Sequence, residues 1–225
     1  MGQTLVFRIH ESGAARDATV TIDHAVIAGW TGRDQEALEK HIVELEEMGI
    51  ARPASTPIFY RVSASRLTSA PMLEVSGGDS SGEVEFFLLR HDGKLYVGVG
   101  SDHTDRKVEA YNVTVSKQMC DKPVAAELWA WDDVKDHWDS LLLRSWIAGD
   151  TLYQDGGVTA MLDPADLMAR YAPDGLAEGT LMFCGTLAAI GGIRPSESLT
   201  IELSDPILGR SIRHSYAMRE LPVVG

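Results

Sequence analysis

The stretch that decides the fold reads Gly82-Glu83-Val84-Glu85-Phe86-Phe87-Leu88-Leu89. In a β-strand successive side chains point to opposite faces, so the two glutamates share one face with Phe87 and Leu89. Two carboxylates therefore begin a face that ends as apolar core. Partly buried like charges roughly 7 Å apart along a strand are unfavourable unless a cation neutralises them or one takes up a proton. A bound metal ion is the simplest explanation of this pattern.

A second predicted strand, residues 95–99, brings a third carboxylate to the same place. It follows a turn at His91-Asp92-Gly93-Lys94 and is followed by Asp102. Because a hairpin returns the chain to where it began, we expect Asp102 to lie beside Glu83 and Glu85. An all-oxygen set suits a hard cation such as Mg²⁺, Mn²⁺ or Ca²⁺. On spacing alone, an edge strand whose exposed glutamates protect against aggregation is an open alternative.

The composition is that of an ordinary globular protein and argues against several classes of function. The 225 residues are 44% hydrophobic, and 20 Lys+Arg against 33 Asp+Glu give a formal net charge of -13. Nucleic acid is disfavoured as a partner, because binding to phosphates depends on clustered Lys and Arg. No stretch approaches the roughly 20 apolar residues of a membrane span, so we expect a soluble, cytoplasmic protein without a membrane partner.

The cysteines do not indicate a chemistry of their own. Only Cys120 and Cys184 are present, without a CxxC spacing. We expect two buried free thiols rather than a disulfide framework or a structural zinc site. A cysteine hydrolase built on Cys120 is disfavoured, because the sequence supplies no partner histidine nearby.

Helical periodicity is confined to a few segments. Residues 34–48 predict the clearest helix, because four apolar residues recur there at spacings of four and three and a glycine follows. A shorter helix is predicted at residues 164–171. An amphipathic stretch with Trp131, Val134 and Trp138 predicts another, and we expect these tryptophans to pack in the core.

The rest of the chain consists largely of short β-prone runs, which predict an α+β protein that is mainly β. The serine-rich residues 63–81 read as loop and weak strand, so we place a soft boundary there. It separates an N-terminal α/β segment, residues 1–65, from a β-roll catalytic domain, residues 66–225. Strands are predicted at residues 5–9, 18–22, 24–27, 58–62, 83–89, 95–99, 140–147, 152–154, 180–184 and 199–203.

The acidic residues belong to a longer series of short motifs. Glu83-Val84-Glu85 is followed by Asp102-His103-Thr104-Asp105-Arg106, by residues 117–123 and 154–161, and by Gly185-Thr186. In this order they resemble the Glu-x-Glu and Asp-x-Thr/Ser-x-Arg signatures and later motifs of the fumarylacetoacetate hydrolase family. The resemblance covers most of residues 25–210, and the order of several weak motifs argues against coincidence.

The resemblance implies a fold, a metal and a class of substrate. It implies a mixed β-sandwich roll with a small N-terminal α/β segment, and usually a homodimer. It also implies a divalent metal, Mg²⁺ or else Mn²⁺ or Ca²⁺, held by Glu83, Glu85 and Asp102. Members of the family hydrolyse, hydrate, decarboxylate or isomerise small 2-oxo or 1,3-dioxo acids, which places a small-molecule oxo-acid in the site.

Four more residues gain roles from the same resemblance. Arg106 and Lys117 would pair with carboxylate or carbonyl oxygens of the substrate, and Lys117 would also take part in catalysis. Thr186 would offer a hydroxyl, and Gly185 would leave room for a close approach. His103, next to a proposed ligand, reads as a hydrogen-bonded turn histidine rather than a metal neighbour.

The predicted helix at residues 34–48 carries a possible acid-base pair on a lid. His41-Ile42-Val43-Glu44 resembles the family's His-x-x-Glu on a mobile N-terminal segment, and a spacing of three puts both side chains on one side of a helix. His41 would take a proton from water while Glu44 orients and stabilises the imidazolium. A pair on a solvated surface is the alternative, and Glu47-Met48-Gly49 competes as the match.

Two departures from the family bear on substrate and reaction. Arg61 stands where the family has a lysine after the lid, and the segment between Glu85 and Asp102 is shortened, with no room for the usual helix. The prediction is a divalent-metal-dependent hydrolase that acts on a carbon–carbon bond of a small 2-oxo or 1,3-dioxo acid through an enolate. A decarboxylase, hydratase or tautomerase of an oxo-acid, and a non-catalytic binding protein on the same scaffold, are the alternatives.

Overall fold

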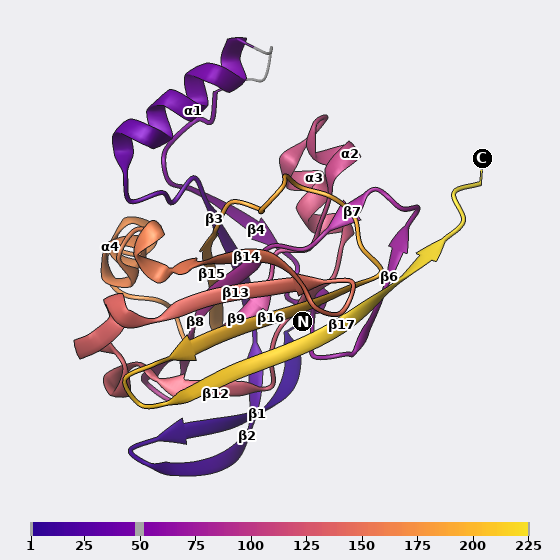
Figure 1. The fold of residues 1–225 in the computed structure, drawn as a ribbon. Coiled ribbons are helices and arrows are strands. Elements are labelled where there is room, and N and C mark those ends of the chain that lie inside the picture. Colours follow the sequence, from indigo (N-terminus) through magenta and orange to yellow (C-terminus); the bar gives the residue numbers. More distant parts are fainter. Residues whose placement is uncertain (1, 48–51, 225) are drawn as a thin grey trace.

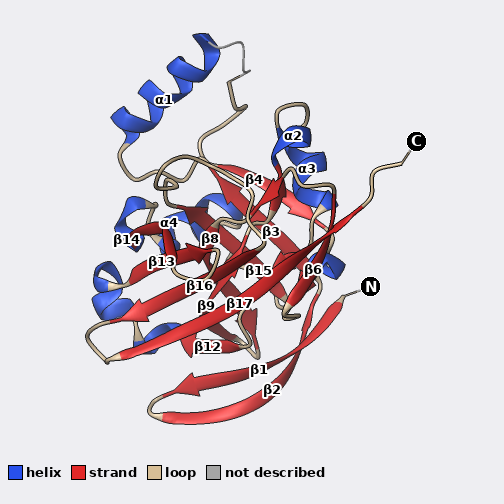
Figure 2. Ribbon diagram, turned by 45° about the vertical axis from the view of Figure 1, so that its right-hand side comes forward, coloured by secondary structure: helices blue, strands red, loops and turns tan. Residues whose placement is uncertain are grey.

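The computed structural model describes residues 2–47 and 52–224, which form two twisted sheets and a few helices (Figure 1). The larger sheet curls into a half-barrel, which Figure 2 shows from a second side. Its eight strands are, in spatial order, β2 (Ala14–Ile22), β1 (Gln3–Glu11), β12 (Glu127–Ala130), β9 (Lys94–Ser101), β8 (Val84–His91), β15 (Thr180–Thr186), β3 (His24–Gly29) and β4 (Ile58–Val62).

The second sheet has five strands and lies against one face of the larger one (Figure 1). Its spatial order is β14 (Thr151–Gly157), β13 (Leu142–Ile147), β16 (Ser198–Asp205), β17 (Arg210–Leu221) and β6 (Met72–Ser76). Two short pairs complete the sheet structure, β10 (Thr104–Asp105) with β7 (Ser80–Ser81) and β11 (Lys122–Pro123) with β5 (Leu67–Thr68).

Side-chain caps fix where the helices begin. Asp34 accepts hydrogen bonds from the amides of the first turn of the longest helix, and Asp105, Asn112 and Asp163 cap the three others. The longest helix projects beyond the sheets in both views (Figures 1 and 2). The helices are α1 (Gln35–Glu47), α2 (Arg106–Glu109), α3 (Val113–Met119) and α4 (Pro164–Tyr171), and four 3₁₀ turns are η1 (Ala64–Arg66), η2 (Trp131–Asp133), η3 (Lys135–Ser140) and η4 (Val158–Ala160).

Strand β8 divides its side chains between two apolar cores, as the alternation of its sequence predicts. Phe86 and Leu88 belong to the core that joins the two sheets. Phe87 and Leu89 belong to the core on the opposite face of the larger sheet. The face that begins with Glu85 therefore ends in buried apolar side chains, which confirms the predicted pattern.

Strands from both sides of the predicted boundary at residues 65 and 66 pair in the larger sheet. Strand β3 pairs with β4 on one side and with β15 on the other. The division into two domains stays a prediction. The protein is mainly β, as the sequence indicates, and no helix in the described ranges has the length and apolar character of a membrane span.

One predicted helix is wrong, and several elements were missed. The stretch with Trp131, Val134 and Trp138 forms two short 3₁₀ helices, η2 and η3, rather than one continuous helix, because Val134 leaves the helical region at φ -124 and His137 at φ -131. The ring of Trp138 packs edge-on against Phe86 at 4.9 Å, so its expected core role is confirmed. Strands β6 and β17 and helices α2 and α3 had no strong periodicity in the sequence.

Asp205, at the end of β16, should link stability to acid pH. It accepts hydrogen bonds from the amides of Ile207 and Leu208, and from Arg210 Nε at 3.3 Å, with His137 Nε2 3.1 Å away. Burial by itself raises the pKa of Asp205, but these partners, led by Leu208, bring it below the usual value.

A carboxyl whose folded pKa is lowered adds stability above its unfolded pKa of about 3.9 and loses it as the pH falls through the folded value. Asp205→Asn should therefore lower the free energy of unfolding by roughly 1–3 kcal/mol at neutral pH. It should also flatten the decline below about pH 4, which urea unfolding across pH would measure. An unchanged acid profile would contradict this.

Candidate metal and substrate site

Three carboxylates meet where β8 begins and β9 ends. Oxygens of Glu83, Glu85 and Asp102 all lie within 4.8 Å of one another. The hairpin causes the meeting, because Val84 pairs with Ser101 and the Asp102 amide donates to the Glu83 carbonyl at 3.1 Å. The predicted convergence is therefore found, while the role of these residues as metal ligands stays a prediction.

Burial and neighbouring charges together give the three carboxyls different affinities for protons. Burial raises the pKa of Glu85 well above its usual value, and the charges of Asp102 and Glu83 raise it further. Burial also raises the pKa of Glu83, against the opposing charge of Arg106. For Asp102 burial has the same direction, but two lysine charges outweigh it and hold the pKa well below normal. A cation bound beside Glu83 and Glu85 would therefore favour the ionised forms of both carboxyls.

Two buried lysines surround Asp102. Lys117, on α3, contacts Oδ2 of Asp102, and Lys122, on β11, lies with its Nζ 3.0 Å from Oδ1. Lys122 also donates to the carbonyl oxygen of His103 and is fully buried. Both lysines hold Asp102 in place, and lone pairs of its two oxygens remain for a metal because each oxygen can accept more than one partner.

Arg106, the first residue of α2, sits on the other side of the carboxylates. Its Nη2 lies 3.2 Å from Glu83, its Nη1 donates to Glu109 at 2.8 Å, and its Nε donates to the Ser81 hydroxyl at 2.7 Å. The guanidinium is thus fixed on three sides beside the acidic cluster.

Gly185 contacts the Glu85 carboxylate through its backbone. Its amide donates to Oε2 of Glu85 at 2.7 Å. Its φ of +104 is disfavoured for other residues, and a Cβ there would lie 1.8 Å from the Thr31 hydroxyl oxygen. Only glycine fits this position without displacing Thr31.

Gln154, on β14, connects the parts of the site; it begins the motif at residues 154–161, but no role was predicted for it. Its Oε1 accepts from the Val84 amide at 2.9 Å, and its Nε2 donates to the hydroxyl of Thr186 at 2.8 Å. The Thr186 hydroxyl in turn donates to the Val84 carbonyl. The hydroxyl proton of Thr186 is therefore used within the protein, and the side chain offers oxygen lone pairs and a methyl group to the site. A buried glutamine within a β-run was the signal available for Gln154.

The proposed acid-base pair lies on α1, whose backbone is described. The side chains of His41 and Glu44 are outside the described part of the structure, as are Met48 and Gly49 of the competing match. Arg61, the departure after the lid, turns away from the site and contacts Tyr171 and His24.

His103 and the cysteines behave as structural residues. His103 Nδ1 lies 3.1 Å from the Tyr216 hydroxyl and Nε2 lies 2.9 Å from the Ser80 hydroxyl, so neither nitrogen is open. Burial, then the charges of Lys122 and Arg106, lower the pKa of His103 to about 3. Cys120 and Cys184 are buried free thiols, as expected.

The carboxylates open into a pocket of about 690 Å³. One part of its lining, the charged wall, comes from β8, β9, α2 and α3. The other part, the apolar wall, comes from the residue after β3, the middle of β4, the start of α3 and the loop after β15. The charged wall comprises Glu83, Glu85, Asp102, Arg106, Glu109 and Lys117, and the apolar wall comprises Trp30, Tyr60, Val113, Leu187, Ala189 and Ile193.

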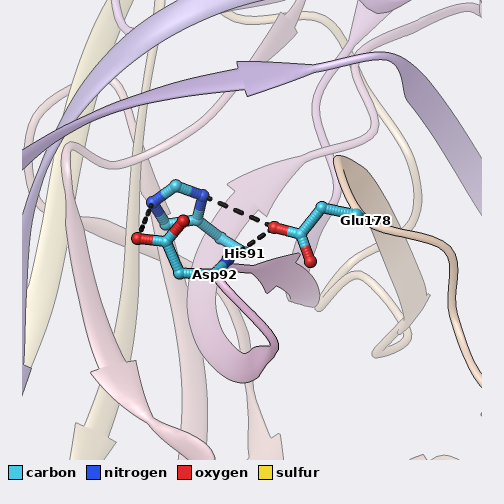
Figure 3. Close-up of side chains that lie close together, drawn as sticks. All are labelled: His91, Asp92 and Glu178. Carbon is cyan, nitrogen blue, oxygen red and sulfur yellow. Dashed lines mark hydrogen bonds and ion pairs between the residues drawn. The ribbon is translucent and has the colours of Figure 1, made fainter.

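A second group of metal-binding residue types lies at the turn between β8 and β9 (Figure 3). His91 Nε2 is 3.5 Å from Asp92, and His91 Nδ1 is 3.8 Å from Glu178. Glu178 already accepts the amides of Asp92 and Gly93, so its carboxylate holds the tight turn. The three residues therefore stabilise the turn. The turn contains no helix, as expected from the short segment between Glu85 and Asp102.

Comparison with known proteins supplies a family and a fold. A family model described as "Protein of unknown function (DUF2848)" matches residues 28–216. No curated protein matches the chain. Solved structures that share the fold over nearly the whole chain include several of the fumarylacetoacetate hydrolase family.

Three of these structures illustrate the range. One is from Oleispira antarctica, proposed to be a fumarylacetoacetate isomerase/hydrolase, with a TM-score of 0.67, 19% identity, and coverage of 94% of this chain and 99% of that one. Another is from Burkholderia cenocepacia, proposed to be a fumarylpyruvate hydrolase, with a TM-score of 0.66, 18% identity, and coverage of 96% of this chain and 92% of that one. The third is 5-carboxymethyl-2-hydroxymuconate delta-isomerase from Mycobacterium smegmatis, with a TM-score of 0.64, 14% identity, and coverage of 92% of this chain and 81% of that one. At these identities the likeness shows the fold alone.

Proposed function

From the premise that the chain belongs to the DUF2848 family and has the fold of fumarylacetoacetate hydrolase family proteins, we propose that it is a divalent-metal-dependent hydrolase. Its substrate would be a small 2-oxo or 1,3-dioxo acid, cleaved at a carbon–carbon bond through an enolate. The observation that carries this proposal is the buried cluster of Glu83, Glu85 and Asp102 in the wall of a pocket.

The donor set fits a hard cation, because all three ligands are carboxylate oxygens and two of them have raised pKa values that a cation would offset. Glu83, Glu85 and Asp102 would hold Mg²⁺ or Mn²⁺. The bound ion would supply a Lewis acid that stabilises negative charge on an enolate oxygen.

The remaining residues would bind and orient the substrate. Lys117 lies 5.6 Å from the centre of the Tyr60 ring and in contact with Asp102, so its ammonium group faces the pocket beside the proposed metal. Lys117 and Arg106 would bind carboxylate or carbonyl oxygens. His41 and Glu44, on α1, would form the acid-base pair that activates water.

An isomerase of oxo-acids is the second candidate, since the isomerase of Mycobacterium smegmatis shares the fold. Decarboxylation and hydration are further alternatives on the same site, as is a non-catalytic binding protein. Incubation with acylpyruvates and product analysis by NMR separates them. Hydrolysis gives two acids, and decarboxylation releases CO₂. Hydration gives one product that is the substrate plus a water molecule, and isomerisation gives one product with the composition of the substrate.

Metal binding is the first test of the proposal. After removal of metal by EDTA, Mg²⁺ or Mn²⁺ at about 100 times its Kd should stabilise the folded state by about 2.7 kcal/mol. For a chain of this length that corresponds to a rise in Tm of roughly 5–10 °C. A thermal scan with no shift at millimolar metal would argue against the enzyme.

We also propose that the protein is a homodimer that binds neither nucleic acid nor membrane. Light scattering after gel filtration would test the dimer, and an electrophoretic shift assay and vesicle sedimentation would test the two negative proposals.

A further inference from the structure

We infer that the substrate carries a single carboxylate, at its oxo-acid head, and an uncharged apolar tail that lies against the apolar wall of the pocket. This inference rests on the proposed function and names the class of oxo-acid within it. It follows from the charges of the pocket lining, from their pairing, and from the composition of the apolar wall.

The charges in the described lining leave no cation for a second carboxylate. The charged wall holds four carboxylates and two cations, and Lys122, buried behind Asp102 outside the lining, adds a third cation, so a bound divalent ion would leave a single positive charge for the substrate. Both cations of the lining are already paired, Arg106 with Glu83 and Glu109, and Lys117 with Asp102. One substrate carboxylate can share the metal and these two cations. A second would be buried without a partner, which is strongly unfavourable.

Two arginines near the pocket have other partners. Arg61 is adjacent to Tyr60 but contacts Tyr171 and His24. Arg194 stacks on the ring of Tyr153 at 5.0 Å, and its Nη1 donates to two backbone carbonyls. Neither belongs to the pocket lining.

The apolar wall favours a tail that is buried by hydrophobic contact. Tyr60 and Val113 stand beside the charged wall, and Leu187 and Ile193 belong to the loop after β15. Ile193 is 57% exposed, which leaves apolar surface for a ligand to cover. Each methylene that a ligand buries there should strengthen binding roughly fourfold.

Three probes with the metal-loaded protein test the inference by calorimetry. Oxalate reports on the head site alone, 2-oxo-4-methylpentanoate adds a branched apolar tail, and 2-oxoglutarate adds a carboxylate tail of similar length. We expect 2-oxo-4-methylpentanoate to bind at least about tenfold more tightly than 2-oxoglutarate.

The outcomes separate the two proposals. If oxalate binds but 2-oxoglutarate binds as tightly as 2-oxo-4-methylpentanoate, or more tightly, the inference on the tail is overturned and the proposed function stands. If neither metal nor oxalate binds, both are overturned.

A charge placed in the apolar wall provides the matched variant. Ile193→Lys should improve binding of 2-oxoglutarate by about two- to fivefold and weaken binding of 2-oxo-4-methylpentanoate. Ile207→Lys, at another exposed isoleucine in the turn between β16 and β17, should leave both affinities unchanged. Equal effects of the two variants would contradict the assigned wall.

Discussion

Replacing Glu85 by glutamine should abolish the rise in Tm caused by metal and reduce turnover at least about 100-fold. Loss of a residue that only supports a ligand lowers metal affinity by about 10- to 100-fold, so loss of a ligand should exceed that range. Glutamine keeps the shape of the side chain and can accept the Gly185 amide. The raised pKa of Glu85 shows that burial disfavours its charge, so the metal-free variant should be at least as stable as the wild type.

Glu74→Gln is the matched control for this experiment. Glu74 lies on β6 with its Oε1 3.3 Å from the exposed Arg219, and it does not belong to the pocket lining. Its removal should change neither the metal shift nor turnover. Retention of the full metal shift by Glu85→Gln would show that Glu85 does not hold the ion.

The parts of the fold that the sequence predicts are those in which local pattern and tertiary environment agree. Strand β8 is buried on both faces except at its end, and the alternation that starts at Glu85 still assigns Phe87 and Leu89 to one face. The hairpin with β9 followed from the Asp92-Gly93 turn, where both residues have positive φ. Helix α4 was found with its observed bounds because Asp163 and Pro164 mark its start.

Elements that depend on distant packing could not be predicted. Strand β17 is half exposed and mixes polar residues at both alternating positions, and its pairing with β6 joins residues far apart in the chain. The tryptophans near residue 135 have helical spacing, but the sheets supply a core that accepts both rings from two tight turns. Periodicity records which residues are apolar, and it cannot distinguish a helix from turns that bury the same set.

The residues of the candidate site likewise include some that local sequence predicts and some that it does not. Glu83, Glu85 and Asp102 were predictable because one hairpin places all three. Gln154 and Lys122 lie within two of the motifs named above but were given no role, because their local sequence does not show that they contact the start of β8 and Asp102. Lys122 follows Asp121 and precedes Pro123, and nothing in that local sequence indicates complete burial.

The burial of Lys122 leads to the second large effect. Lys122→Met should lower the free energy of unfolding of the metal-free protein by about 3–5 kcal/mol, the range for removing one partner of a buried ion pair. The variant leaves Oδ1 of Asp102 without its cation and the His103 carbonyl without its donor. Urea unfolding monitored by tryptophan fluorescence measures the loss.

The metal response of the same variant tests the electrostatic reason. Removal of a positive charge from beside the carboxylates should strengthen their attraction for a divalent ion, so the metal-induced rise in Tm should be at least as large as in the wild type. Lys135→Met removes an exposed lysine that lies 2.6 Å from Asp132 and should have no measurable effect. Wild-type stability in Lys122→Met would mean that Lys117 alone supports the charge of Asp102, and a smaller metal shift would mean that Lys122 orients Asp102 as a ligand.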